Sequence, residues 1–281
     1  MSIRLLACDI DDTLVRFPDP PSERVVRALR AAIDAGVTVA LVTGRAFPRA
    51  RPIAQSLGIT APLICNHGGS IRHLDGSLIH AESVPRPLMA EIVGWLQMQN
   101  VVMMLFDVGK GCVDGDASVP AIYHDCTAGQ VVPDFHPYTD GPGTRFVCDL
   151  RAYIPEQTET LLVSSLDHDH LAGVYERACV KFDDRARMLF THPYGLDILA
   201  QTATKSQSLA WLAGQVGAAQ DEVMAIGDGV NDIDMLVWAG IGVAMGNARP
   251  ETKAVADVIA PSFEADGVAW AVERFVLRID R

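Results

Sequence analysis

Short apolar runs alternate with longer amphipathic stretches along the first third of the chain. The runs cover residues 3–8, 37–42 and 63–65, and each has the length and character of a buried strand. Between them, residues 23–35 and 47–57 place apolar side chains at helical spacing, and a glycine follows each stretch. This β-α-β-α-β order predicts a parallel sheet with helices on both faces.

The last third of the chain resumes this alternation, whereas the middle differs. The apolar runs of the last third lie at residues 223–226, 241–244 and 258–259, and its helix-like stretches at 206–216, 232–238, 250–256 and 267–277. The middle has strand-like segments at 101–106, 146–150 and 188–191 and helix-like stretches at 87–98 and 156–166. We therefore expect an α/β protein whose doubly wound, Rossmann-like core comprises residues 1–82 and 194–281, with an α+β domain of residues 83–193 inserted into it.

The composition is that of an ordinary globular protein with an acidic balance. The 281 residues are 49% hydrophobic, and the formal net charge of −12 disfavours a nucleic-acid-binding surface, which needs a basic footprint. No apolar run approaches the ~18 residues of a membrane span, and the N-terminus turns acidic too soon for a signal peptide. The six cysteines form no C-x-x-C pair, so we expect reduced thiols and a cytoplasmic protein. The oligomeric state stays open.

Polar residues follow the ends of four predicted core strands. They are Asp9 and Asp11 after the first run, Thr43, Gly44 and Arg45 after the second, Asn66 and His67 after the third, and Asp228, Asn231 and Asp232 after the run at 223–226. In open α/β sheets, ligands bind outside the carboxyl ends of the strands. Because four strands carry polar residues at that one edge, we expect these side chains to gather in one site.

The residue types at this edge suit phosphoryl transfer. Carboxylates such as Asp9, Asp11 and Asp228 are the hard oxygen ligands that Mg²⁺ prefers, and a carboxylate near the ion can attack phosphorus. The hydroxyl of Thr43 and the backbone N–H of Gly44, at a predicted helix start, are suited to hold phosphoryl oxygens.

Each signal also has a structural alternative when it is taken alone. Lys205 precedes the predicted helix at 206–216, where an ammonium opposes the helix dipole; we interpret it as a clamp on phosphate charge, the alternative being a surface charge. The acidic run at Asp9 could be a solvated loop, and Thr43 could cap a helix. Arg45 is open to a structural or a ligand-binding role. His67 is interpreted as a packing residue of its loop, with substrate contact as the alternative.

Together, these segments resemble the haloacid dehalogenase (HAD) superfamily of aspartate-nucleophile phosphatases. Their order and spacing are similar to those of its Cof-type, sugar-phosphatase-like branch, which carries a large α/β cap (type IIB) where the insertion lies here. The matching segments are Asp9-Ile10-Asp11-Asp12-Thr13-Leu14, Leu41-Val42-Thr43-Gly44-Arg45, Lys205, Gly227-Asp228-Gly229-Val230-Asn231-Asp232-Ile233-Asp234-Met235-Leu236 and Val243-Ala244-Met245-Gly246-Asn247-Ala248. The resemblance implies that the inserted domain is a cap that selects the substrate.

The resemblance also implies catalytic and metal-binding roles. Asp9 would attack the phosphoryl group, and Asp11 would protonate the leaving oxygen and then activate water against the aspartyl-phosphate. Mg²⁺ would be bound by the Asp9 carboxylate, the Asp11 backbone carbonyl and Asp228. Asp232 would be a nearby carboxylate, either a direct ligand or one that supports the ligands.

The same resemblance implies that the phosphoryl group is bound by Thr43, Lys205 and Asn231, beside the N–H of Gly44. Two positions depart from the usual pattern of the branch. Asp12 stands where glycine is usual, and we expect the turn to survive because aspartate tolerates left-handed geometry. The residue after Lys205 is serine instead of glycine, which is harmless at a helix start.

The function that these features imply is a Mg²⁺-dependent phosphatase. It would hydrolyse a small phosphomonoester, in particular a sugar phosphate, through an aspartyl-phosphate intermediate, with no nucleic-acid or membrane partner. One alternative is a phosphomutase that uses the same intermediate, and another is a non-catalytic binding protein on this fold. The sequence does not identify the phosphate ester or the cap residues that contact it.

Overall fold

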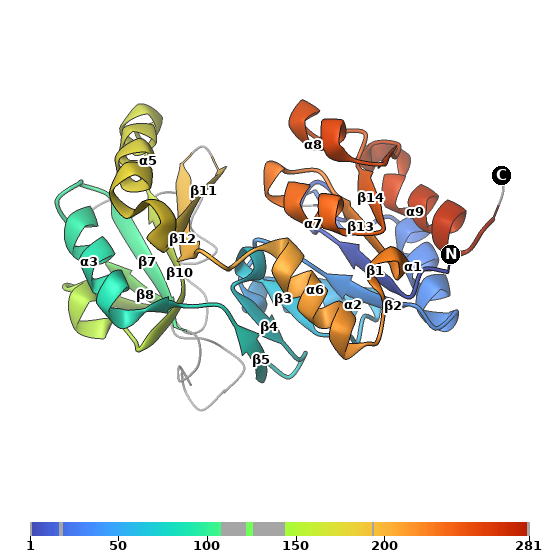
Figure 1. Cartoon of the computed structure of the whole chain (residues 1–281), viewed down its shortest axis with the longest axis horizontal. Helices are drawn as coiled ribbons and strands as arrows, with labels where there is room; N and C mark the ends of the chain where they lie inside the picture. The colour runs from blue at the N-terminus through green and yellow to red at the C-terminus, as the bar shows by residue number, and fades with distance from the viewer. Residues whose placement is uncertain (1, 17–18, 108–121, 126–143, 193, 280–281) are drawn as a thin grey trace. The chain divides into compact units, whose positions relative to one another are not determined.

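The computed structural model describes residues 2–16, 19–107, 122–125, 144–192 and 194–279 (Figure 1). Contacts divide the chain into two compact units. Met1–Leu74 with Thr204–Arg281 is called the core unit below, and Asp75–Ala203 is called the inserted unit. The sequence pattern places the limits of the insertion at residues 83 and 193, inside those given by the contacts.

A five-stranded parallel sheet forms the centre of the core unit, in the order β15-β14-β13-β1-β2. Its strands are β1 (Leu5–Cys8), β2 (Thr38–Leu41), β13 (Val223–Gly227), β14 (Ile241–Ala244) and β15 (Val258–Ile259). Next to β2, β3 (Leu63–Cys65) joins through a parallel bridge between Val42 and Ile64, and it pairs antiparallel with β4 (Ser70–Arg72). Every residue of β1 and β13 is buried, which explains why these strands read as unbroken apolar runs.

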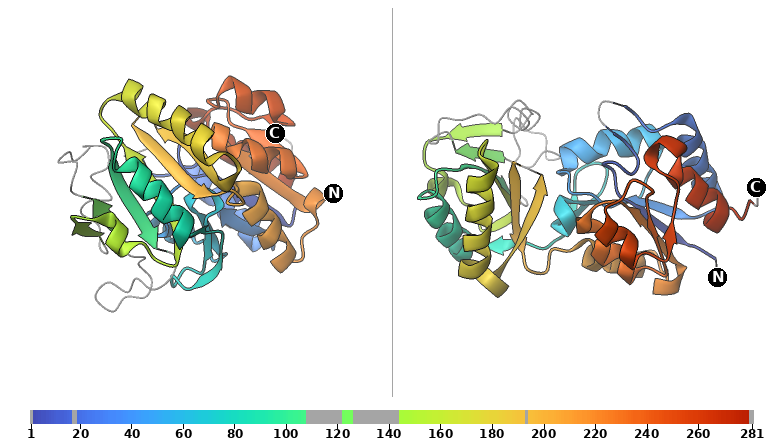
Figure 2. Two further views of the ribbon diagram at one scale, coloured as in Figure 1. Left: turned by 60° about the vertical axis from the view of Figure 1, so that its left-hand side comes forward. Right: turned by 90° about the horizontal axis from the view of Figure 1, so that it is seen from above.

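Helices cover both faces of this sheet (Figures 1 and 2). They are α1 (Glu23–Asp34), α2 (Phe47–Leu57), α6 (Lys205–Gln215), α7 (Ile233–Trp238), α8 (Pro250–Val255) and α9 (Gly267–Ala271), which continues into a π-helical turn, Val272–Val276. The chain crosses from β1 to β2 on one side and from β13 to β14 on the other. The expected doubly wound α/β fold is thus confirmed, and the strand order reverses between β1 and β13, the kind of point at which such sheets bind ligands.

Local signals set the ends of several helices. Ser22 caps α1 by accepting a backbone N–H of the first turn at 3.2 Å, as its position predicts. Gly58 ends α2 in the left-handed conformation, at φ 72°. The helix predicted at 206–216 begins one residue earlier, at Lys205, because Thr204 is its cap and accepts the N–H of Gln207. Lys205 is therefore the first residue of α6.

A mainly antiparallel sheet forms the centre of the inserted unit, in the order β11-β12-β10-β7-β8-β9, with β8 and β9 parallel. Its strands are β7 (Val102–Asp107), β8 (Ile122–Asp125), β9 (Thr144–Val147), β10 (Gln157–Ser164), β11 (Ala186–His192) and β12 (Gly195–Ala200). A short strand, β6 (Val84–Pro85), pairs with β10, and β5 (Leu78–Ala81) comes before β6 in the chain. Two helices, α3 (Arg86–Leu96) and α5 (His168–Phe182), pack their apolar faces with Leu161 and Ile198 into one core.

The stretch at 156–166 is a strand, so the helix predicted there is wrong. β10 pairs antiparallel with both β7 and β12 and therefore lies inside the sheet. Its residues are buried on both faces of the sheet. Leu161 and Val163 point to one face and Thr160 points to the other, and all three are buried. Burial on both faces removes the polar alternation that marks a half-exposed strand, and a short apolar run alone does not separate strand from helix.

Among the described residues, we find no helix with the length and apolar character needed to cross a membrane. Cys8 in β1 and Cys179 in α5 are free thiols. Burial raises the pKa of Cys8 above its usual value, and the neighbouring charge of Asp9 raises it further. Cys112 and Cys126 lie outside the described residues.

Candidate active site

The carboxyl ends of β1 and β13 bring Asp9 and Asp228 to the same edge of the sheet. The two strands pair with Cys8 opposite Ile226, and the Asp9 N–H donates to the Ile226 carbonyl at 2.9 Å. Asp9 is thus the first residue after β1, and Asp228 is the first after β13. Asp9 is only 5% exposed, so its carboxylate lies in a site largely closed to water.

Lys205 reaches the same place from the first turn of α6. Its side chain is fully buried, and Nζ donates to Asp9 Oδ1 at 2.5 Å and to Asp232 Oδ1. Burial alone would lower the pKa of this ammonium, but the charges of Asp232 and Asp9 raise it well above its usual value. Lys205 is therefore a cation that bridges two buried carboxylates, and the interpretation of a surface charge is excluded.

Both carboxylate oxygens of Asp232 are engaged within the core unit. Oδ1 accepts from Lys205, and Oδ2 accepts the N–H groups of Asp228 at 3.0 Å and Gly229 at 2.8 Å. A Cβ at position 227 would lie 2.5 Å from the Asp232 carboxyl carbon, so Gly227 allows the loop to close. These contacts mean that Asp232 shapes the loop that carries Asp228 and also orients the lysine.

The described residues include one group of three acids close enough to share a metal ion: Asp9, Asp228 and Asp232 each offer an oxygen within 4.8 Å of the others. Asp228 also accepts from Thr13 Oγ1 at 3.0 Å. Burial and then the charge of Asp232 raise the pKa of Asp228 to about 7, against the hydrogen bond from Thr13. Burial likewise raises the pKa of Asp9, although Lys205 opposes it. Three carboxylates around one ammonium leave a negative charge that favours a cation.

The side chain of Asp11 has a different partner. Arg45 donates from Nε to Asp11 Oδ2 at 2.8 Å and from Nη2 to Oδ1, so the guanidinium holds this carboxylate by two bonds. The Asp11 side chain is 55% exposed, whereas that of Asp9 is 8% exposed. The structure therefore keeps the Asp11 carboxylate outside the buried acidic group and gives Arg45 an ion pair with it.

Thr43 and Gly44 lie just after β2, and β2 is the neighbour of β1, the strand that Asp9 follows. Thr43 is fully buried, and its hydroxyl accepts the N–H of Arg45 at 3.1 Å, which closes a tight turn. The ring of His67 covers Gly44, where an added Cβ would lie 2.3 Å from Cε1 of that ring. Both residues predicted to hold phosphate are thus at the expected edge of the sheet.

Asn231 contacts His67, which the sequence analysis interprets as a packing residue of its loop, with substrate contact as the alternative. Its Nδ2 donates to Nδ1 of His67 at 3.2 Å, and His67 is 5% exposed. The contact joins the loop after β13 to the loop after β3. A signal existed in the sequence, because polar residues followed by Gly68-Gly69 at a strand end are typical of a tightly turned loop.

The loop after β1 is held by contacts that the sequence does not signal. Asp12 adopts the left-handed conformation at φ 54°, as expected of aspartate at this departure from the family pattern. Its carboxylate accepts from Arg16, and its carbonyl accepts from Asn247 Nδ2 at 2.8 Å. Asn247 in turn accepts the N–H of Phe263 at 2.8 Å. A segment from the end of the chain thus fixes the backbone beside Asp11.

Ser206 anchors the start of α6. Its N–H and its hydroxyl both donate to Asp234 Oδ2 at 3.1 Å. Ser206, the second departure from the family pattern, is therefore hydrogen-bonded to Asp234. Asp234 is a further residue that supports the site and that the sequence analysis did not identify. The contact ties the helix that carries Lys205 to the helix that follows Asp232.

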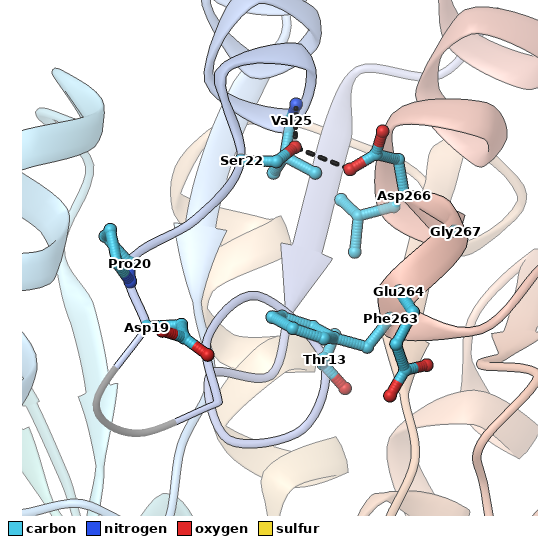
Figure 3. A pocket seen from close by; sticks show the side chains of 10 residues that line it. Thr13, Asp19, Pro20, Ser22, Val25, Phe263, Glu264, Asp266 and Gly267 are labelled. Atoms are coloured by element: carbon cyan, nitrogen blue, oxygen red, sulfur yellow. Dashed lines mark hydrogen bonds between the residues drawn. The ribbon is translucent and has the colours of Figure 1, made fainter.

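A pocket in the core unit is lined by residues that precede and begin α1 and α9, together with Thr13 (Figure 3). Thr13 and Phe263 line it, and the hydroxyl of Ser22 donates to Asp266 at 2.5 Å on its wall. The other lining residues are Asp19, Pro20, Val25, Glu264, Gly267 and Val268. Thr13 links it to the site, since the Thr13 hydroxyl donates to Asp228.

Comparisons with known proteins place this chain in a family. A model of haloacid dehalogenase-like hydrolases matches residues 6–272. A 5-amino-6-(5-phospho-D-ribitylamino)uracil phosphatase of Bacillus subtilis is 28% identical over 280 residues, covering 99% of this chain and 97% of that protein. The chloroplastic endoribonuclease YBEY of Arabidopsis thaliana is 26% identical over 278 residues, which make up 95% of this chain but only 46% of that protein. The crystal structure of a haloacid dehalogenase-like hydrolase from Bacteroides thetaiotaomicron superposes with a TM-score of 0.82 at 25% identity, covering 97% of this chain and 99% of that one.

These comparisons agree with the fold of the core unit and of the inserted unit. The resemblance drawn from the sequence segments is confirmed, and so is the expectation that the protein is a hydrolase. The family model spans nearly the whole chain, including the insertion between the two core segments. The chain belongs to the haloacid dehalogenase-like hydrolase family.

Proposed function

We propose that the protein is a Mg²⁺-dependent phosphatase of a small phosphomonoester, in particular a sugar phosphate. The observation that carries this proposal is the buried Lys205 bridging Asp9 and Asp232, with Asp228 beside them. A nucleophile next to a fixed cation is what attack on an anionic phosphoryl group requires. The relative from Bacillus subtilis supports the substrate class, because its name describes a phosphatase of a phospho-ribityl compound.

Mg²⁺ fits the donor set on chemical grounds. Asp9 and Asp228 offer hard carboxylate oxygens close together. Burial is the main cause of their raised pKa values, and a divalent cation would compensate the ionised carboxylates there. Both carboxylate oxygens of Asp232 already accept hydrogen bonds, from Lys205 and from backbone N–H groups. We therefore propose that Asp232 orients the groups around the ion and that Asp9 and Asp228 are its ligands. When bound, the ion would supply positive charge to the phosphoryl oxygens.

In the proposed reaction, an Asp9 oxygen forms a bond to phosphorus while the bond from phosphorus to the ester oxygen breaks. Asp11 gives its proton to the leaving oxygen, and its carboxylate then takes a proton from the water that hydrolyses the aspartyl-phosphate. Because Arg45 holds this carboxylate by two hydrogen bonds, Asp11 has to leave Arg45 to reach the leaving oxygen. Release of Asp11 from Arg45 is thus part of the proposal.

Four groups hold the transferred phosphoryl in this proposal. The Lys205 ammonium offsets its charge, and the Thr43 hydroxyl, the Gly44 N–H and the Asn231 amide donate to its oxygens. Lys205 is already fixed by Asp9 and Asp232, so its charge needs little reorganisation during the reaction. We further propose that the inserted unit acts as the cap that selects the substrate.

The test is the substitution Asp9→Asn, with Asp34→Asn as the matched control, because Asp34 is an exposed residue at the end of α1. Phosphate release from a panel of sugar phosphates is measured with Mg²⁺ and with EDTA. We expect D9N to lose at least about 100-fold in kcat/KM and the control to keep full activity. Near-normal release by D9N would refute the nucleophile assignment. Isomerised sugar phosphate without free phosphate would establish a phosphomutase instead.

A further inference from the structure

The loop Asn66–Gly68 joins separate parts of the proposed phosphoryl site. On one side it contacts the turn after β2, where the Asn66 N–H donates to the Arg45 carbonyl and the His67 N–H donates to the Thr43 carbonyl, both at 3.0 Å. These two bonds hold the turn that presents the Thr43 hydroxyl and the Gly44 N–H.

On its other side, the loop contacts α6 and the loop after β13. The Ser208 hydroxyl of α6 donates to the Gly68 carbonyl at 2.8 Å, and a Cβ at Gly68 would lie 2.2 Å from the Thr204 carbonyl oxygen. The His67 ring accepts from Asn231. One short segment therefore packs against the elements that carry Thr43, Lys205 and Asn231.

The backbone of this loop is strained. Asn66, His67 and Gly68 have φ values of 46°, 56° and 98°, so two successive residues with side chains adopt the left-handed conformation. L-residues rarely adopt it, and it persists only where surrounding contacts impose it. Strain of this kind is concentrated at functional sites, and here it directs the His67 ring back over the Thr43 turn.

The His67 ring contacts Asn231 and lies over Gly44. An amide NH₂ group only donates, so Nδ1 is the acceptor of the 3.2 Å contact with Asn231 Nδ2. The edge of the ring with Cε1 and Nε2 lies over Gly44, where an added Cβ would be 2.3 Å and 2.6 Å from these atoms. The ring thus orients the Asn231 amide and closes the space above Gly44.

We propose that His67 is a positioning residue for phosphate binding, which rests on the proposed function. By accepting from Asn231 while covering Gly44, its ring keeps the Asn231 amide and the Gly44 N–H in one fixed arrangement. A packing residue needs only the volume of the ring, whereas a positioning residue also needs the Nδ1 acceptor. Phenylalanine separates these roles because it keeps an aromatic ring of similar shape and removes the acceptor.

The experiment is a double-mutant cycle with His67→Phe and Asn231→Ala, with His73→Phe as the matched control in an exposed position of the core unit. Phosphate-ester hydrolysis and competitive inhibition by inorganic phosphate are measured for each variant. We expect H67F to lower kcat/KM and phosphate affinity by roughly tenfold each, the size of one oriented hydrogen bond. In the N231A background, H67F should change either quantity by less than about twofold, because the shared interaction is already absent.

Three outcomes overturn the proposal: H67F behaves like wild type, H67F has the same effect in both backgrounds, or H73F matches H67F. If H67F does not fold, ¹⁵N NMR of the histidine rings of wild type and N231A decides. We expect an Nε2–H tautomer for wild-type His67 that N231A perturbs, and an unchanged ring signal refutes the role. If wild type hydrolyses no ester, the proposed function fails alone, since phosphate binding and the ring signal still test His67.

Discussion

At the scale of single residues, the site depends on one buried cation. Lys205 is enclosed completely, and its bonds to Asp9 and Asp232 compensate two carboxylates that would otherwise be isolated from water. Removing one partner of a buried ion pair is much more costly than the net value of the pair, because the remaining charge is left without compensation. The lysine therefore stabilises the fold of the site.

We predict that Lys205→Met destabilises the metal-free protein by about 3–5 kcal/mol at pH 8. The loss should shrink toward pH 5, because burial raises the pKa of Asp9 and protonation then removes the uncompensated charge. Urea unfolding at both pH values measures it. Lys253→Met in α8 is the control and should change stability by less than about 1 kcal/mol. Equal losses in the two variants would contradict the prediction.

At this scale, the sequence predicts that Asp9, Asp228 and Asp232 gather, but not how each is used. It also places Asp11 with them, whereas the Asp11 carboxylate lies outside this group, on Arg45. Asp9 and Asp228 could be placed together because the carboxyl ends of parallel strands share one edge. The partner of Asp11 could not be predicted, since it depends on how the turn after β2 presents Arg45. The position of Asp232 beneath Lys205 likewise depends on the backbone of the loop after β13, which no spacing rule specifies.

At the scale of helices and strands, the ends of elements are set by local backbone preferences. Gly58 ends α2 at φ 72°, a conformation that costs a residue with a Cβ about 1–2 kcal/mol. Gly94, by contrast, lies inside α3 with ordinary space around it, since an added Cβ would be 3.9 Å from the nearest side-chain atom. The two glycines therefore have opposite effects on stability when they are substituted.

We predict that Gly94→Ala stabilises the protein by about 0.5–1 kcal/mol, because glycine loses more backbone entropy than alanine on entering a helix. Gly58→Ala should destabilise it by about 1 kcal/mol or more, although nothing lies within 4 Å of the added atom. Thermal unfolding of both variants under one condition checks the signs. A stabilising G58A would show that α2 ends differently in solution.

The one element of the wrong type shows where local patterns stop being informative. Residues 156–166 contain one short apolar run that does not separate strand from helix, and β7 and β12 pair with β10 on its two sides. The hydrogen bonds and burial of a central strand come from segments distant in sequence, and these override a weak helical preference. The short core strands were predicted correctly because turn glycines and polar strand ends bounded them.

At the scale of the whole molecule, the pH dependence of stability is tied to the buried acidic group formed by Asp9, Asp228 and Asp232. Asp228 has a pKa of about 7 in the folded protein against an ordinary value of 3.8. Between these values the folded state binds more protons than the unfolded state, so the free energy of unfolding falls as the pH rises. The contribution of protonated Asp228 to stability is fully present below about pH 4 and is lost as the pH rises through about 7.

We therefore predict that the metal-free protein loses stability from pH 5 to pH 8 and that Asp228→Asn weakens this dependence. Mg²⁺ should restore stability mainly at pH 8, where the carboxylates are ionised, by about 2.7 kcal/mol at a hundredfold excess of free ion over its Kd. Melting temperatures at both pH values, with Mg²⁺ or EDTA, measure the effect. Equal Mg²⁺ stabilisation of wild type and D228N would exclude Asp228 as a ligand.

The sequence by itself determined the doubly wound class of the core and the strand ends that carry its acids. These properties follow from short-range periodicity and from a geometric rule shared by all parallel sheets. Only the tertiary structure decided which partner each polar group has: Lys205 between Asp9 and Asp232, Arg45 on Asp11, and His67 on Asn231. Those pairings depend on loop backbones and on burial between distant segments, and neither is encoded in local spacing.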